Sequence, residues 1–144
     1  MTKYKLAVAS DHSGIYLKDK IISKLSSQGI KILDLGTDSE ERVDYPDYSK
    51  KLVEEIVDQS CEYGILISAN GIGMSISANR SSSVRAALCT STGMAQKARL
   101  NYNANVLVIG SKITDDETSL AMIDNFLSTK FEGGRHKRRI DKIS

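Results

Sequence analysis

A short loop of small residues, 68–73 (SANGIG), is the first segment whose composition points to chemistry. It follows an apolar run, and a strand end that leads through glycines into a helix presents backbone N–H groups that can converge on an anion. A plain turn in which glycine supplies the backbone angles is the alternative. A dinucleotide-binding fingerprint would need a third glycine where Ile76 stands, so the pattern favours an anion site and disfavours NAD binding.

Asp11 and His12 follow another apolar run, residues 4–9 (YKLAVA). Side chains just beyond a strand end are the ones that contact ligands in a doubly wound sheet. The Asp11 carboxylate can accept a hydrogen bond from a sugar hydroxyl, and the His12 imidazole can donate to a phosphate or move a proton near neutral pH. The alternative is a helix N-cap followed by a surface histidine, and Ser13 can provide such a cap equally well.

The C-terminal run Arg-His-Lys-Arg-Arg begins at Arg135. Arg135 and Arg139 are four residues apart, so on a helix both guanidinium groups project from one face and can hold one phosphate. A solvated basic end is the alternative, and it is the usual role of an isolated run of charge. A tail that lies over the sheet of its own chain, or of a partner subunit, would favour the phosphate clamp.

The segment 42–48 (RVDYPDY) combines charged and aromatic side chains just ahead of a predicted helix. Most clusters of this kind are ordinary surface. This one is expected on the loop side of the sheet, where Tyr45 can form a wall of a pocket and place its hydroxyl on a ligand.

Short apolar runs and amphipathic stretches alternate along the chain and must position these residues. Strands are predicted over residues 4–9, 30–35, 63–67, 84–89 and 105–109, and helices over 46–58, 93–102 and 115–128, with others before Gly29 and between Met74 and Arg80. Such alternation forces parallel strands joined by crossovers, with helices on both faces. We therefore predict an α/β fold, a three-layer doubly wound (Rossmann-like) parallel sheet of about five strands, followed by a helical basic tail.

Length and charge narrow the class of protein. A chain of 144 residues is close to the roughly 150 residues of one domain, so we predict a single domain over residues 1–144. Residues 135–144 hold five Lys/Arg and one Asp, a net charge of +4, which leaves −2 for residues 1–134 out of the total of +2. A nucleic-acid surface would make the body basic too, so we expect no nucleic-acid binding and a small anionic partner for the cations.

The cysteines and the N-terminus indicate the compartment. Cys61 and Cys89 have no metal-type spacing, and only His12 and His136 can join them, so we expect no metal site. Two isolated thiols favour a reducing compartment. The N-terminal apolar run is too short for a signal sequence, and no run approaches the roughly 20 residues of a membrane span. We expect a cytoplasmic protein without a membrane segment.

Five motifs follow one another over nearly the whole chain. They are SDHSG in the first strand and its loop, ERVDYPDY in the middle, GILISANGIGMSISANR, NANVLVIGSK and the C-terminal FEGGRHKRR. In order and spacing they closely resemble the type B ribose-5-phosphate isomerases. The galactose-6-phosphate isomerase subunits share the same framework, so the resemblance identifies the superfamily more sharply than the substrate.

The resemblance implies a cofactor-free aldose–ketose isomerase of the pentose phosphate pathway, which opens a sugar-phosphate ring and moves a proton between C2 and C1 through an enediolate. It also implies a homodimer, or a dimer of such dimers, in which the neighbouring chain completes each active site. Backbone N–H groups of residues 69–73 would hold the enediolate oxyanion. The implied catalytic residues are Ser68, Asn70, Gly71, Gly73, Asp11 and Asn101. The implied ligands of the sugar and its phosphate are Asp11, His12, Tyr45, Ala69, Ile72, Lys112, Arg135 and Arg139, with both arginines reaching across the dimer.

Three departures from the family pattern bear on mechanism. Ser68 stands where many members have a cysteine as the enolising base, and Met74 stands where others have a glutamate for that task. A serine hydroxyl is a much weaker acid than a thiol, so either another residue assists Ser68 or turnover is slow. Asn101 replaces a histidine that helps to open the ring, and a neutral amide can only hydrogen-bond there. Lys112 replaces an arginine, which keeps the charge and loses the bidentate fork.

Two other functions are compatible with these residues. The first is isomerisation of a hexose phosphate such as galactose 6-phosphate, which needs a longer pocket. The second is a sugar-phosphate binding protein with reduced activity, which the residues at positions 68, 74 and 101 favour and the intact Asp11 and His12 disfavour. Cys89 is the last residue of a predicted strand, on the ligand side, but no neighbouring cation would lower its pKa, so we interpret it as a small buried hydrophobe and not as a substitute base.

Overall fold

A computed structural model describes residues 2–143 of the chain. Five parallel strands form one sheet in the order β2-β1-β3-β5-β4. The strands are β1 (Tyr4–Ser10), β2 (Ile32–Asp34), β3 (Cys61–Ser68), β4 (Ala86–Leu88) and β5 (Val106–Gly110). The register places Leu6 of β1 opposite both Ile32 of β2 and Tyr63 of β3. The prediction of a doubly wound parallel sheet of five strands is confirmed.

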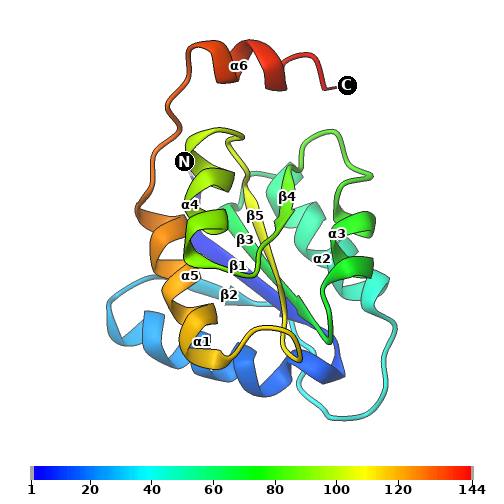
Figure 1. Cartoon of the computed structure of the whole chain (residues 1–144). Helices are drawn as coiled ribbons and strands as arrows, with labels where there is room; N and C mark the ends of the chain where they lie inside the picture. The colour runs from blue at the N-terminus through cyan, green and yellow to red at the C-terminus, as the bar shows by residue number, and fades with distance from the viewer. Residues whose placement is uncertain (1, 144) are drawn as a thin grey trace.

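Helices cover both faces of the sheet, which makes three layers (Figure 1). One face carries α1 (Ile15–Ser27), α4 (Thr92–Leu100) and α5 (Asp116–Ser128), and the other carries α2 (Tyr45–Val57) and α3 (Ile72–Ala78). A single 3₁₀ turn, η1 (His12–Gly14), precedes α1, and the basic tail forms α6 (Arg135–Ile140). Among residues 2–143, no helix has the length and the apolar composition that crossing a bilayer requires.

The central strands are apolar throughout because they are buried on both faces. Along β1, Leu6 and Val8 face the core under α1, α4 and α5, whereas Ala7 and Ala9 face the core under α2 and α3. All four side chains are fully buried. Adjacent residues therefore belong to two different cores, which explains why the sequence shows unbroken apolar runs.

Capping residues fix where the helices begin. The Ser91 hydroxyl accepts the Met94 N–H at 3.2 Å to start α4, and the Asp115 carboxylate accepts the Thr118 N–H at 2.7 Å to start α5. Hydrogen bonds from the backbone and the side chain of Thr118 lower the pKa of Asp115. The strand predicted over residues 84–89 is shorter, Ala86–Leu88, and just before it the Arg85 N–H donates to the Asn105 side chain.

The carboxyl ends of the five parallel strands lie along one edge of the sheet, the carboxyl-terminal edge, and their amino ends lie along the opposite, amino-terminal edge. Different segments of the chain lie beyond these two edges. At the carboxyl-terminal edge, β1 leads to β2 on one side and β3 leads through α3 towards β4 on the other. This divergence makes the gap between β1 and β3 the topological switch point, where ligands bind in open α/β sheets. Figure 1 shows α6 at the opposite end, beyond the amino-terminal edge.

Candidate active site

The loop after β3 is closed by two of its own side chains. Ser68 is buried, and its Oγ accepts the Gly71 N–H at 3.0 Å. The Asn70 Oδ1 accepts the Ile72 N–H at 2.9 Å. Two of the amides in the predicted anion loop, those of Gly71 and Ile72, are thus engaged within it. The N–H groups of Gly73 and Met74 lie in the first turn of α3, where the helix itself offers no acceptor.

Three glycines let neighbouring elements approach this loop closely. Gly71 has φ +78°, and a Cβ there would lie 2.6 Å from the Leu88 side chain. A Cβ on Gly73 would lie 2.5 Å from the Tyr45 ring, and one on Gly110 would lie 2.8 Å from the Asn70 backbone. Real Cβ atoms do not approach so closely, so a side chain at any of these places would require the loop or its neighbours to shift.

Asp11 joins the end of β1 to the same loop region. Its N–H donates to the Ile67 carbonyl at 3.2 Å, and its carboxylate accepts the Ser13 N–H at 2.9 Å. Asp11 is therefore the cap of η1, and Ser13 is not. The residue is 7% exposed. A carboxylate oxygen that the capping bond leaves free can still accept a hydrogen bond from a ligand.

His12 and Tyr45 reach the site from two different loops. The His12 Nδ1 accepts the Val43 N–H at 3.2 Å, which ties the loop after β1 to the segment that precedes α2. Tyr45 is the first residue of α2, and its ring lies against Gly73. The structure thus brings Asp11, His12 and Tyr45 together with the anion loop, as the sequence predicts.

The loop after β5 completes this edge. The Ser111 N–H donates to the Ser68 carbonyl at 2.8 Å, and the Lys112 N–H donates to the Ala69 carbonyl at 2.9 Å. The Ser111 hydroxyl donates to the Ser13 carbonyl at 2.9 Å. Lys112 is exposed beside the anion loop. Ser111 and Gly110 were not predicted as site residues, although a Gly-Ser pair just after an apolar run is a signal that would have found them.

Asn101, Arg135 and Arg139 lie at the other edge of the sheet. Helix α4 starts at the carboxyl-terminal edge and runs back, so Asn101 at its C-terminal end is near the amino-terminal edge. The Glu132 N–H donates to the Leu100 carbonyl at 3.0 Å, which holds the tail beside Asn101. Both arginines are exposed on α6. A single chain therefore does not bring these three residues to the anion loop.

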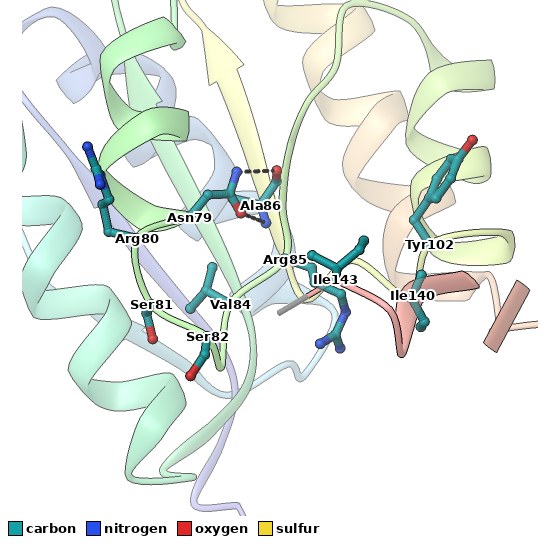
Figure 2. Close-up of a pocket in the computed structure, with 10 residues that line it drawn as sticks. All are labelled: Asn79, Arg80, Ser81, Ser82, Val84, Arg85, Ala86, Tyr102, Ile140 and Ile143. Atoms are coloured by element: carbon teal, nitrogen blue, oxygen red, sulfur yellow. Dashed lines mark hydrogen bonds between the residues drawn. The ribbon is translucent and has the colours of Figure 1, made fainter. Parts of the chain in front are cut away.

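The tail stands off from the body of the molecule. A pocket of about 360 Å³ separates α6 from the segment that follows α3. Figure 2 shows Tyr102 and Ile140 on one side of this pocket and Ser82 and Val84 on the other. His136 is buried, with its Nε2 3.6 Å from the Glu132 carboxylate.

Two sulfur-containing residues occupy the core and not the site. Met74 is fully buried and packs with the α2 and α3 side of the core. Cys89 is 2% exposed, and burial raises the pKa of its thiol to about 11, so its interpretation as a small buried hydrophobe is confirmed. Within residues 2–143, no group of three or more His, Cys, Asp or Glu side chains is placed to hold a metal ion.

Comparisons with known proteins find relatives along the whole chain. Residues 6–143 match the model of the ribose/galactose isomerase family. Ribose-5-phosphate isomerase B of Escherichia coli is 36% identical over 140 residues, which cover 97% of this chain and 94% of the relative. The crystal structure of a ribose 5-phosphate isomerase from Thermotoga maritima is 49% identical, with a TM-score of 0.95 and coverage of 97% of both chains. Ribose-5-phosphate isomerase B of Mycoplasma genitalium, solved with bound ribulose 5-phosphate, is 38% identical, with a TM-score of 0.94 and coverage of 99% of this chain and 95% of the other.

Proposed function

The chain belongs to the ribose/galactose isomerase family, and on that premise we propose that it is an aldose–ketose isomerase that interconverts ribose 5-phosphate and ribulose 5-phosphate. One observation carries the proposal: Asp11, His12, Tyr45 and the anion loop converge at the switch point of the sheet. The names of the relatives at 36–49% identity support the five-carbon substrate.

In the proposed reaction, the open-chain sugar lies along the carboxyl-terminal edge. The Asp11 carboxylate and the Tyr45 hydroxyl hold the sugar hydroxyls. A proton leaves C2, negative charge develops on the carbonyl oxygen at C1, and a proton passes from the C2 hydroxyl to that oxygen. Protonation of the resulting enediolate at C1 then leaves the carbonyl at C2. In this proposal the amides of Gly73 and Met74, in the first turn of α3, stabilise that oxyanion, a contribution of about 3 kcal/mol for one well-placed donor.

Ser68 is the proposed proton acceptor at C2. An alkoxide is costly to form, so a serine needs support that a thiol would not. The Gly71 N–H donates to the Ser68 Oγ at 3.0 Å and therefore stabilises negative charge on that oxygen. We expect turnover to be slower than with a cysteine at the same place.

We further propose that the enzyme is a homodimer with shared active sites. The phosphate of a sugar at the carboxyl-terminal edge would meet His12 and Lys112 of the same chain, while Arg135 and Arg139 lie at the other edge. A two-fold axis perpendicular to the strands reverses the partner's strand direction, and so brings its amino-terminal edge to this chain's carboxyl-terminal edge. Asn101 and both arginines would then come from the partner.

The free edge of β4 is the surface proposed for this contact. Among residues 2–143, β4 pairs with β5 alone, and α3 and α4 flank it on the two faces. Large apolar side chains on both flanks are exposed: Ile72, Ile76, Met94 and Tyr102. Apolar side chains that flank an unpaired strand are a feature of subunit interfaces.

The remaining parts of the proposal follow from this reaction. Moving a proton between neighbouring carbons needs no cofactor. We propose that residues 1–144 act as one isomerase domain and that the enzyme works in the cytoplasm, where phosphorylated sugars are metabolised.

An isomerase assay tests the proposal. Purified protein is offered ribose 5-phosphate and galactose 6-phosphate in parallel, and the ketose products are measured. We expect turnover of the pentose phosphate and at most slow turnover of the hexose phosphate. Binding of ribose 5-phosphate without conversion above the rate in solution would instead establish a binding protein, and preferred turnover of the hexose would reassign the substrate.

A further inference from the structure

The imidazole of His12 is held by a backbone group far away in the sequence. Its Nδ1 accepts the Val43 N–H at 3.2 Å, and the two residues are 31 positions apart. Val43 is half-buried and lies between the exposed Arg42 and the cap residue of α2, Asp44. Nothing in the side chain of Val43 suggests a role in a polar site, and sequence reasoning did not find one.

The direction of this hydrogen bond determines which ring nitrogen carries hydrogen. A neutral imidazole has one N–H and one bare nitrogen, and only the bare nitrogen can accept from an N–H donor. Because Nδ1 accepts from Val43, the hydrogen of neutral His12 is on Nε2. The ring therefore presents a donor on the side that faces away from Val43.

An anionic ligand needs that orientation. A phosphate oxygen is stabilised by an N–H donor and repelled by a bare nitrogen lone pair. With hydrogen on Nε2, His12 can bind a phosphate as a neutral donor, whereas the other tautomer would present a lone pair from that nitrogen.

The segment that carries Val43 is itself fixed on the site. Asp44 has an extended backbone, and Tyr45, two residues after Val43, lies against Gly73 at the start of α3. The beginning of α2 thus bridges the ends of β1 and β3, with Val43 on His12 and Tyr45 on the anion loop. The bond to His12 is thus one of two contacts that tie this segment to the site.

From this geometry we infer that Val43 is a positioning residue: its backbone N–H selects the Nε2–H tautomer of His12 and so makes the imidazole a phosphate donor. The inference rests on the proposed function for the identity of the ligand. The tautomer itself does not depend on that function.

A proline at position 43 removes the N–H, and alanine is the matched control that keeps it. The chain has two histidines, His12 and His136, so long-range ¹⁵N–¹H spectra of labelled protein are simple, and a His136→Gln variant assigns them. We expect the Nε2–H pattern for His12 in the wild type and in Val43→Ala. In Val43→Pro we expect signal from the Nδ1–H tautomer.

Kinetics on ribose 5-phosphate give an independent readout. Val43→Pro should raise KM about tenfold relative to Val43→Ala, with a smaller effect on kcat. In a His12→Gln background, the glutamine amide donates without help from Val43, so proline at 43 should then change KM by less than about twofold. This cycle separates the loss of the donor from a general disturbance of the loop.

Hydrogen on Nδ1 in the wild type, or an unchanged Nε2–H pattern in Val43→Pro, would overturn the positioning role of Val43. An equal KM increase from proline in the wild-type and His12→Gln backgrounds would overturn it too. An Nε2–H pattern in the wild type that proline abolishes, in a protein that turns over no sugar phosphate, would leave the positioning role intact and reject the proposed function.

Discussion

The two edges of the sheet are built in opposite ways. At the carboxyl-terminal edge, backbone hydrogen bonds and close glycine contacts fix the ends of β1, β3 and β5 against one another. At the amino-terminal edge, the six-residue helix α6 carries exposed arginines across a pocket from the body. The first edge is held together by contacts within one chain, and the second exposes its charge.

The difference bears on the proposed shared active site, which takes one part from each edge. Contacts that must be accurate to a fraction of an ångström, such as donors aimed at an oxyanion, are placed on a packed frame. Two guanidinium groups that hold a phosphate tolerate more freedom, because long side chains can adjust. A shared site between two chains would use both properties, with the rigid edge of one subunit facing the adjustable tail of the other.

The largest expected effect is at the rigid edge. In Gly71→Ala, the new Cβ would lie 2.6 Å from the Leu88 side chain and 3.2 Å from that of Val108, so the loop or these neighbours must move. A misplacement of about 1 Å near reacting atoms can cost about 100-fold in kcat/KM, and we expect a loss of that size. Gly29→Ala is the matched control, because Gly29 has φ +81° with nothing near its Cβ position. If both variants lost activity equally, the close packing of the loop would not matter.

A smaller effect is expected at the tail. Arg139→Ala should raise KM for ribose 5-phosphate about 10- to 100-fold, which corresponds to about 1.5–3 kcal/mol for a charge-assisted hydrogen bond, while kcat changes little. Lys142→Ala removes another exposed cation from the same tail and should leave KM within about twofold of wild type. Equal effects of the two variants would mean that the tail acts only through its net charge.

Ser68 tests the chemistry of the rigid edge. Ser68→Ala should lower kcat about tenfold with little change in KM, because the hydroxyl acts mainly in the transition state. Ser68→Cys should raise kcat above wild type, because a thiol gives up its proton more readily. Unchanged kcat in Ser68→Ala would remove this residue from the mechanism.

The smallest effect is expected at Cys89. Burial raises the pKa of its thiol from 9.0 to about 11, so it stays neutral at pH 8, and Cys89→Ala should leave kcat within about twofold of wild type. The thiol ionises at lower pH in the unfolded chain than in the folded one. The free energy of unfolding should therefore fall as the pH rises from 9 towards 11, and less steeply in Cys89→Ala. Urea titrations at pH 8, 9 and 10 measure this slope, and equal slopes would contradict the assignment of a buried neutral thiol.

Much of the fold could be predicted because burial leaves a direct mark on sequence. Strands such as β1 and β5 are buried on both faces and appear as apolar runs, and Gly29 ends α1 where the helical stripe stops. It was possible to predict that Asp11, His12 and Tyr45 lie near the anion loop because they are near the ends of strands. The carboxyl ends of parallel strands lie along the same edge of the sheet.

The details that sequence reasoning missed are contacts between backbone groups. The Val43 N–H on His12 and the Ser111 N–H on the Ser68 carbonyl involve atoms that every residue carries, so no residue type marks them. The hydrogen bond from the Gly71 N–H to the Ser68 Oγ was not predicted for a related reason, since it depends on the turn geometry of the loop. The position of Asn101 on the far edge follows from the direction of α4, which a list of motifs does not contain.

The most direct test of shared sites mixes two damaged chains. Asp11→Asn keeps the cap of η1 and removes the charge from the rigid edge, while an Arg135→Ala, Arg139→Ala double variant disables the tail. When the two proteins are unfolded together in equal amounts and refolded, half of the dimers are mixed, and each mixed dimer has one site with both halves intact. We predict recovery of about a quarter of the wild-type activity. Activity no greater than the average of the two separate variants would contradict the account.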